Sequence, residues 1–196
     1  MKYTQIKSCR LCKSKKIKKL IDFGKIACSS TFPLKKIKYN QITPMVFCIC
    51  TNCDLAQLLH NYSLNELYND NYGYRSGINQ AMVNHLTSIT SDIKNIIKLK
   101  KNDKILDIAS NDGTLLKTYN SSKLNYVGID PTIDRFKSLY PKNFKTKSTF
   151  FSKKKYLDLA KGNKAKAITS IAVFYDVAEP DKFMSEIKDI LHEDGI

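Results

Sequence analysis

One segment, residues 104–131, constrains the fold more than any other part of the chain. Residues 104–109 form a short apolar run typical of a buried parallel strand, and small, turn-prone residues follow it at once. A helix-like stretch at 114–119 comes next, and a second buried-strand run at 126–129 ends on Asp130. A strand, a tight turn into a helix and an acidic residue closing the next strand form the unit that binds an adenosine ribose in α/β enzymes.

The turn keeps only part of the usual glycine pattern. Asp107 opens a D-x-G-x-G-x-G frame whose glycine positions are held by Ala109, Asn111 and Gly113. Alanine is small enough for close backbone approach, and asparagine tolerates positive φ better than most residues. A pyrophosphate needs bare backbone, whereas a cationic tail suits the acids Asp107 and Asp112. The pattern therefore favours S-adenosylmethionine (SAM) over NAD, and the alternative is an ordinary strand-turn-helix that binds no ligand.

The length and composition limit the class of protein. A chain of 196 residues can build one sizeable core or two modest domains. Its apolar runs are too short to span a membrane, and its first residues lack the apolar core of a signal peptide. Six cysteines without an export signal indicate a reducing compartment. We therefore expect a cytoplasmic protein with no membrane partner.

The net charge of +15 is concentrated at the N-terminal end. Residues 1–60 carry twelve Lys and Arg against Asp22 and Asp54. Such a region can bind nucleic acid, and a zinc-dependent nucleic-acid module would bind oligonucleotides in a salt-sensitive way. However, the charge lies in short lysine runs with a single arginine and no aromatic platform. A solvated basic face that attracts anionic ligands, without a nucleic-acid partner, is the favoured interpretation.

Two C-x-x-C pairs, Cys9 with Cys12 and Cys50 with Cys53, predict a metal site. Each pair can hold one side of a metal ion, and together they complete a tetrahedral set of thiolates. Four thiolates leave no open coordination position, so we expect structural Zn²⁺ that takes no part in chemistry. A redox disulfide is the alternative for one pair but explains the second poorly. Cys48 lies outside the spacing and is expected to be a small buried hydrophobe.

We divide the chain into a zinc-binding domain at 1–62, a connector with an amphipathic helix at 63–99, and a Rossmann-like SAM-binding domain at 100–196. Apolar residues recur at spacings of three and four from Ile78 to Ile97 and predict the helix. The expected strands of the first domain lie near 18–23 and 44–49. The expected elements after Asp130 are helices at 133–139, 154–161 and from Pro180, with strands at 144–146 and 165–173. This alternation predicts a doubly wound parallel sheet.

With both modules identified, the chain resembles the SAM-dependent sugar C-methyltransferases that carry an N-terminal zinc-binding domain and act on nucleotide-linked deoxysugars. The resemblance is carried by six motifs: Cys-Arg-x-Cys at 9–12, Cys-x-x-Cys-x-Leu-x-Gln-Leu at 50–58, Tyr-x-Tyr-x-Ser-Gly at 72–77, Leu-Asp-Ile-Ala-Ser-Asn-Asp-Gly-Thr-Leu-Leu at 106–116, Val-Gly-Ile-Asp-Pro at 127–131, and Ile-Thr-Ser-Ile-Ala-x-Phe-Tyr-Asp at 168–176. The Ser-Asn-Asp-Gly variant of the loop is far more specific than a generic glycine pattern.

The resemblance implies roles for individual residues. It places zinc on the four cysteines, the methionine moiety of SAM against 109–113, and Asp130 on the ribose hydroxyls. Tyr72, Tyr74 and Ser76 would lie over the active site, where a tyrosine hydroxyl can orient the sugar or help to deprotonate it; packing at the domain seam is the alternative. The residues expected to bind the cofactor are Asp107, Ala109, Ser110, Asn111, Asp112, Gly113, Asp130, Pro131 and Tyr175. Ser76 is the expected substrate residue.

The sequence departs from this family in one respect. The family's base lies in a His-Glu-His-type stretch beyond the fifth strand, and none of the three histidines matches it. Ile196 reads as the first residue of such a strand, so we expect the N-terminal part of a class I C-methyltransferase. Its sheet would be incomplete after the fourth strand, and a separately encoded C-terminal half is a candidate partner. In the full enzyme, a base would deprotonate the carbon next to the 4-keto group, and the enolate would take the methyl group. The alternative is a zinc-containing nucleic-acid-binding protein or a non-catalytic SAM-binding protein.

Overall fold

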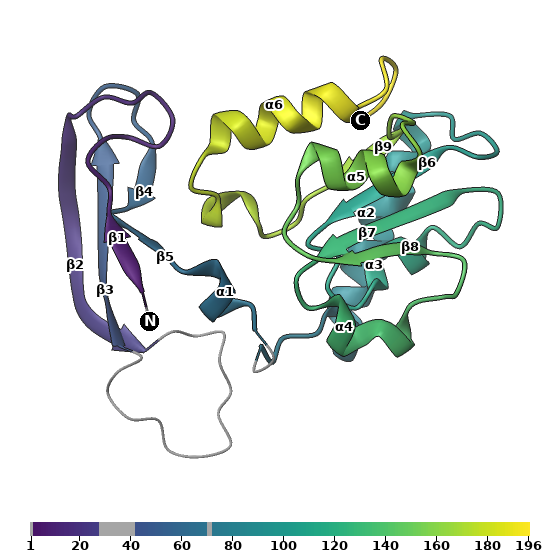
Figure 1. Cartoon of the computed structure of the whole chain (residues 1–196), viewed down its shortest axis with the longest axis horizontal. Coiled ribbons are helices and arrows are strands. Elements are labelled where there is room, and N and C mark those ends of the chain that lie inside the picture. The colour runs from purple at the N-terminus through teal and green to yellow at the C-terminus, as the bar shows by residue number, and fades with distance from the viewer. Residues whose placement is uncertain (1, 28–41, 70–71) are drawn as a thin grey trace. The chain divides into compact units, whose positions relative to one another are not determined.

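The computed structural model describes residues 2–27, 42–69 and 72–196. The chain forms two compact units, the first comprising Met1–Tyr74 with Tyr175–Asp181 and the second Arg75–Phe174 with Lys182–Ile196 (Figure 1). We describe each unit by itself. None of the helices in the described ranges is both long and apolar enough to cross a bilayer.

The first unit is built from antiparallel strands. Strand β3 (Ile42–Cys50) pairs on one side with the long strand β2 (Ile17–Ala27) and on the other with β4 (Ala56–Leu58). A separate ladder joins β1 (Tyr3–Gln5) to β5 (His60–Tyr62), and the short helix α1 (Leu64–Leu67) follows. The strands expected near 18–23 and 44–49 are confirmed, and both are longer than expected.

Alternation along β3 decides what the first unit buries. Val46, Cys48 and Cys50 are buried and point to one face, as the period of two requires. Val46 and Cys48 form a small core with Leu59, against which Ile6 and Ile17 pack. Cys48 is fully buried, which confirms its expected role as a small hydrophobe.

The second unit is a four-stranded parallel sheet (Figure 1). Its strands are β6 (Lys104–Ile108), β7 (Asn125–Asp130), β8 (Lys145–Ser148) and β9 (Ala167–Thr169). Their spatial order is β8-β7-β6-β9. In order of sequence this is 3-2-1-4, the arrangement of a doubly wound Rossmann-like sheet. The predicted α/β fold class is confirmed.

Helices cover both faces of this sheet. Residues of α2 (Gln80–Ile96) and α3 (Thr114–Thr118) share one core with Ile105 and Tyr126 of the strands. Residues of α5 (Lys153–Ala160) and α6 (Pro180–Ile190) share a second core with the next residues along, Leu106 and Val127. Strand neighbours point to opposite faces, so each strand feeds both cores. Shorter helical pieces include α4 (Ile133–Phe136) and the 3₁₀ turns η2 (Ser76–Ile78) and η3 (Lys137–Leu139).

Helix α2 begins later than its apolar pattern. Asn79 caps it by accepting a hydrogen bond from the backbone N–H of Ala81. Ile78 therefore lies before the helix and is 71% exposed, whereas Leu86 and Ile93 are buried as the pattern predicts. Pro180 is the first residue of α6, as expected.

The fourth strand is much shorter than the apolar run 165–173. Strand β9 covers three residues, and Ala172 has a left-handed backbone at φ 56° before the 3₁₀ turn η4 (Phe174–Asp176). Beyond α6, Ile196 donates to the carbonyl of Lys166 at 3.1 Å and accepts from the N–H of Ile168 at 2.8 Å. These two backbone hydrogen bonds place Ile196 beside β9.

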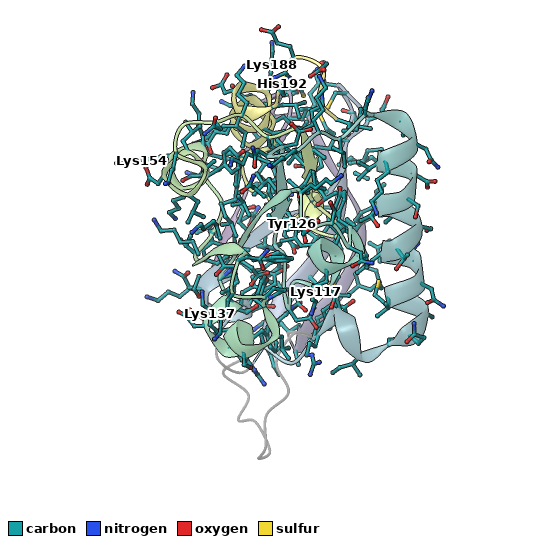
Figure 2. All side chains as sticks on the ribbon, turned by 90° about the vertical axis from the view of Figure 1, so that its right-hand side faces the viewer. Lys117, Tyr126, Lys137, Lys154, Lys188 and His192 are labelled. Atoms are coloured by element: carbon teal, nitrogen blue, oxygen red, sulfur yellow. The ribbon has the colours of Figure 1, made fainter. Side chains whose placement is uncertain are left out.

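Lysine side chains populate the surface of the second unit. Lys137, Lys154 and Lys188 project outward, while Tyr126 lies in the interior (Figure 2). Lys166 is an exception, since it is buried and forms an ion pair with Asp194.

Candidate metal centre and cofactor loop

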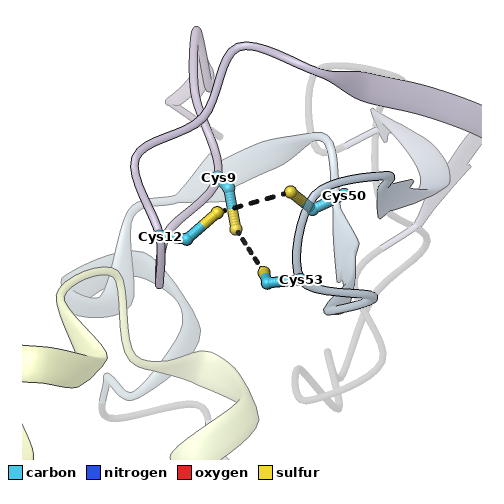
Figure 3. A group of neighbouring side chains, drawn as sticks. All are labelled: Cys9, Cys12, Cys50 and Cys53. Atoms are coloured by element: carbon cyan, nitrogen blue, oxygen red, sulfur yellow. Dashed lines mark hydrogen bonds between the residues drawn. The ribbon is translucent and has the colours of Figure 1, made fainter.

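The four cysteines of the two C-x-x-C pairs come together in the first unit (Figure 3). Their sulfur atoms all lie within 4.8 Å of one another. The Sγ atoms of Cys9 and Cys53 are 3.7 Å apart, and those of Cys12 and Cys50 are 3.5 Å apart. A tetrahedral zinc site with Zn–S bonds of about 2.3 Å separates its sulfurs by about 3.8 Å. The cluster therefore fits a zinc ion.

The two cysteine turns are built alike. Lys13 donates its backbone N–H to the carbonyl of Cys9, and Asp54 donates in the same way to Cys50. Both donors have left-handed backbones, at φ 60° and 58°. The ladder between β2 and β3 pairs Ile17 with Cys50, and this pairing brings the two turns face to face.

The ionisation of these thiols is uneven. Burial raises the pKa of the Cys9 thiol, but hydrogen bonds from the backbone at Cys12 and from the Gln57 side chain outweigh it and lower the pKa to about 6. A hydrogen bond from the backbone at Leu55 lowers the pKa of Cys53. The neighbouring thiols and burial together outweigh this bond and raise the pKa to about 12. The thiols compete because four negative charges cannot share this space without a cation.

Gln57 supports the cluster from outside the set of sulfur ligands. Its Nε2 donates to Cys9 Sγ at 3.3 Å, and its Oε1 accepts from the backbone N–H of Arg10 at 3.1 Å. Arg10 in turn holds the Asn61 side chain through Nε and a terminal nitrogen, at 3.0 and 2.7 Å. Such outer contacts fix the orientation of metal ligands. Gln57 stands in the motif at 50–58, but no local pattern in the sequence predicts this role for it.

The loop after β6, residues 109–113, which we call the cofactor loop, has left-handed backbone at all three glycine positions of its sequence frame. The φ angles are 60° at Ala109, 48° at Asn111 and 73° at Gly113. At each of these positions the backbone has the conformation that glycine adopts freely, although two of the three residues carry side chains. Left-handed backbone is uncommon for residues that carry a side chain, and such residues cluster at functional sites. In this chain, turns at Asn102, Asn120 and Lys161 also adopt it.

Asp107, at the carboxyl end of β6, is a buried acid beside this loop. Burial raises its pKa to about 7, a hydrogen bond from the Thr169 hydroxyl opposes the rise, and nearby Asp130 adds to it. The Thr169 hydroxyl lies 2.7 Å from Asp107 Oδ1. A carboxylate held in this way gains from a cationic ligand.

Asp112 binds the segment that precedes α2. Its Oδ2 accepts from Arg75 Nε at 3.1 Å and from the backbone N–H of Gly77 at 3.0 Å. Its Oδ1 accepts from the backbone N–H and the hydroxyl of Thr114, at 3.1 and 2.6 Å. Burial raises the pKa of Asp112, but the three partners lower it below its ordinary value. The charge of Asp112 is therefore compensated within the protein.

Ser76 joins the same contact through its backbone. Its N–H donates to Asn111 Oδ1 at 2.9 Å, so the Ser-Gly end of the motif at 72–77 rests on the cofactor loop. A Cβ added at Gly77 would lie 2.6 Å from Thr114 Oγ1, which explains the glycine. The part played by the Ser76 hydroxyl in substrate binding remains a prediction.

Asp130 also bonds to the loop. Its Oδ2 accepts from the backbone N–H of Asn111 at 3.0 Å, and its Oδ1 accepts from the backbone N–H and the hydroxyl of Thr132, at 2.6 and 2.5 Å. Next to it, the carbonyl of Pro131 accepts from the Ser148 hydroxyl at 3.0 Å. Contact of Asp130 with a ribose remains a prediction.

Unused polar atoms lie near the carboxyl ends of the strands. The hydroxyl of Ser170, directly after β9, is buried and has no hydrogen-bond partner in the described parts of the chain. A hollow of about 310 Å³ opens beside the loop and is bordered by Arg75, Asp112 and Lys117. Ligands of open α/β sheets collect at the carboxyl ends of the strands, where Asp107 and Ser170 stand. The hollow itself is bordered by residues of 75–83 and 112–118.

The three tyrosines predicted to contact substrate or cofactor, Tyr72, Tyr74 and Tyr175, belong to the first unit. The ring of Tyr72 lies 5.1 Å from that of Tyr68, and Tyr68 donates its hydroxyl to Asp176 Oδ2 at 2.6 Å. Tyr74 is 45% exposed and Tyr175 73% exposed. Their roles toward the substrate and cofactor remain predictions.

Comparison with protein families identifies the region that holds the cysteines. Residues 9–68 match the family model Methyltransf_13, described as "Putative zinc binding domain". The match covers both cysteine turns and the strands between and after them. No curated protein matches the sequence significantly.

Comparison with solved structures finds methyltransferases. The plantazolicin methyltransferase BamL, in complex with triazolic desmethylPZN analog and SAH, has a TM-score of 0.48 at 16% identity, over 58% of this chain and 44% of that one. A putative methyltransferase from an antibiotic biosynthesis pathway of Anabaena variabilis has a TM-score of 0.42 at 17% identity, over 55% of this chain and 42% of that one. A SAM-dependent methyltransferase from Geobacter sulfurreducens, in complex with S-adenosyl-L-homocysteine, has a TM-score of 0.40 at 15% identity, over 57% of this chain and 45% of that one.

The chain thus spans less than half the length of each of these three structures. The strand order of the second unit itself identifies a Rossmann-like α/β fold. The cysteine cluster and the family match together identify an N-terminal zinc-binding region.

Proposed function

We propose that this chain binds SAM on the loop 109–113, holds a structural zinc ion, and belongs to a class I C-methyltransferase that acts on a nucleotide-linked 4-keto-deoxysugar. The left-handed backbone at Ala109, Asn111 and Gly113 carries the proposal. Loops that hold this conformation without all their glycines need a reason for the strain, and binding a cofactor against the loop supplies one. The resemblance in the motifs at 72–77 and 168–176 supports the sugar substrate.

Each part of the site would have a distinct task. SAM, when bound, supplies an electrophilic methyl group. Asp107 would balance the positive charge of the methionine moiety, and Asp130 would accept from the ribose hydroxyls through the lone pairs that its protein partners leave free. Tyr72 and Tyr74 would orient the sugar carbon for attack. The zinc ion would stabilise the first unit, because four thiolates leave it no open position.

A pair of glycine variants tests the cofactor site. Gly113 and Gly162 both have left-handed backbones, at φ 73° and 78°. A Cβ at Gly113 would lie 2.6 Å from the Tyr140 ring, whereas a Cβ at Gly162 would meet nothing within 4 Å. Gly113→Ala should abolish calorimetric binding of S-adenosylhomocysteine (SAH), and Gly162→Ala should leave it unchanged. Equal SAH affinity in both variants would place the cofactor elsewhere.

The substrate class needs a separate assay. None of the three histidines of this chain matches the family's His-Glu-His-type base, so we expect this chain alone to transfer no methyl group. Combined with a segment that supplies that base, it should transfer one methyl group from SAM to a nucleotide-linked 4-keto-deoxysugar, as measured by mass spectrometry of the sugar. Turnover of SAM with a different class of acceptor, with the sugar unmodified, would contradict this part of the proposal and leave the cofactor site intact.

A further inference from the structure

Tyr140, in the connection between η3 and β8, contacts the cofactor loop through its hydroxyl and its ring. The residue is 8% exposed. Its hydroxyl donates to the carbonyl of Asn111 at 2.8 Å and lies 2.9 Å from Ser110 Oγ, which can donate to it. Its ring fills the space beside Gly113 and Gly128, where an added Cβ would lie 2.6 and 3.3 Å from Cε1.

These contacts act on the strained part of the loop. Asn111 has φ 48°, a conformation that glycine adopts freely and that residues with a side chain adopt at an energetic cost. The hydrogen bond from Tyr140 fixes the carbonyl of this residue. Burial raises the pKa of Tyr140 above its ordinary value, so the phenol keeps its proton and remains a donor.

Burial of a tyrosine does not by itself require such a bond in this protein. The hydroxyls of Tyr119 and Tyr156 are also buried, and neither has a hydrogen-bond partner in the described ranges. Tyr156 is fully buried in the core on the α5 and α6 face. The two bonds of Tyr140 to adjacent loop residues therefore mark a specific contact.

We infer that Tyr140 is a positioning residue for the cofactor: it holds Asn111 in the left-handed conformation that the loop needs when glycine is absent from that position. The inference rests on the proposed function, because the loop must bind SAM for the positioning to matter. Loss of the hydroxyl would leave the Asn111 carbonyl without this donor and let the loop relax before the cofactor binds.

The first test compares two matched variants. Tyr140→Phe and Tyr156→Phe each remove one buried hydroxyl and keep the ring. By calorimetry, Tyr140→Phe should bind SAH about tenfold more weakly than the wild type, the equivalent of one lost hydrogen bond, while Tyr156→Phe should bind as the wild type does. Equal SAH affinity in Tyr140→Phe and the wild type would overturn the inference. Absence of SAH binding in the wild type would instead refute the proposed function.

The second test asks whether the Tyr140 hydroxyl acts through the backbone conformation of residue 111. Glycine at position 111 adopts left-handed backbone freely, so the hydroxyl of Tyr140 should matter less in an Asn111→Gly background. We expect Tyr140→Phe to cost clearly less SAH affinity there than in the wild-type background. The same loss in both backgrounds would show that the Tyr140 hydroxyl does not act through the conformation of residue 111 and would contradict the inference.

Discussion

At the scale of single residues, the sulfur cluster needs a cation. Four thiols lie within one coordination shell, and the pKa values of Cys9 and Cys53 are driven in opposite directions, to about 6 and about 12. Zinc would take all four as thiolates and remove the competition. The ion is therefore expected to contribute directly to the folding of the first unit.

Replacing one ligand should remove the metal. Cys53→Ser is expected to reduce bound zinc from one ion per chain to nearly none and to unfold the first unit, because zinc binding supplies folding free energy. Cys48→Ala is the control, since Cys48 is buried outside the cluster and donates to the carbonyl of Gln57. Elemental analysis should find zinc in Cys48→Ala. Full zinc content in Cys53→Ser would contradict the site.

Asp107 should make stability depend on pH in a particular direction. Its folded pKa of about 7 lies above the unfolded value of about 3.9. Protonation of Asp107 therefore stabilises the folded state, and this contribution to the free energy of unfolding is fully present below pH 4 and is lost as the pH rises to about 7. In denaturant titrations the free energy of unfolding of the wild type should fall by about 1 kcal/mol per pH unit relative to Asp107→Asn across this window. Parallel pH profiles of the two proteins would show that Asp107 ionises normally.

At the scale of elements, the start of α2 is fastened to the cofactor loop. Asp112 is 1% exposed and pairs with Arg75, whose side chain is 36% exposed. Ser76 and Gly77 add two backbone hydrogen bonds to the same loop. A segment distant in sequence thus helps to fix the conformation of the loop, and the length of α2 connects this contact to the core.

Removing the cation of this pair should weaken the second unit. Arg75→Ala leaves the buried Asp112 carboxylate without its positive partner, and we expect a loss of about 1–3 kcal/mol in the free energy of unfolding. Arg75→Lys should restore part of it. The control is Lys98→Ala, which removes a charge from an exposed position. Denaturant titration that finds Arg75→Ala as stable as Lys98→Ala would show that the pair contributes nothing.

At the scale of the whole molecule, the sequence predicts what local pattern determines. The cysteine spacing, the apolar period of α2 and the strand-turn-helix after Asp107 each depend on neighbouring residues, and the structure has all three. Tyr140 and Thr169 reach the loop from elements 30 or more residues away in the chain or across the sheet. Only the tertiary fold brings them there, so no local pattern could identify them. The apolar run 165–173 predicts a longer strand than β9, which pairs with β6 only over Ala167–Thr169.

The measurement that tests the account most directly is a comparison of two ligands by calorimetry on the wild-type chain. The loop keeps the conformation of a nucleotide-binding turn but has side chains at two glycine positions and an acid at Asp107, which suits SAH and disfavours a pyrophosphate. We expect SAH to bind saturably at one site per chain and NAD⁺ to show no binding. Binding of NAD⁺ with no binding of SAH would contradict the account.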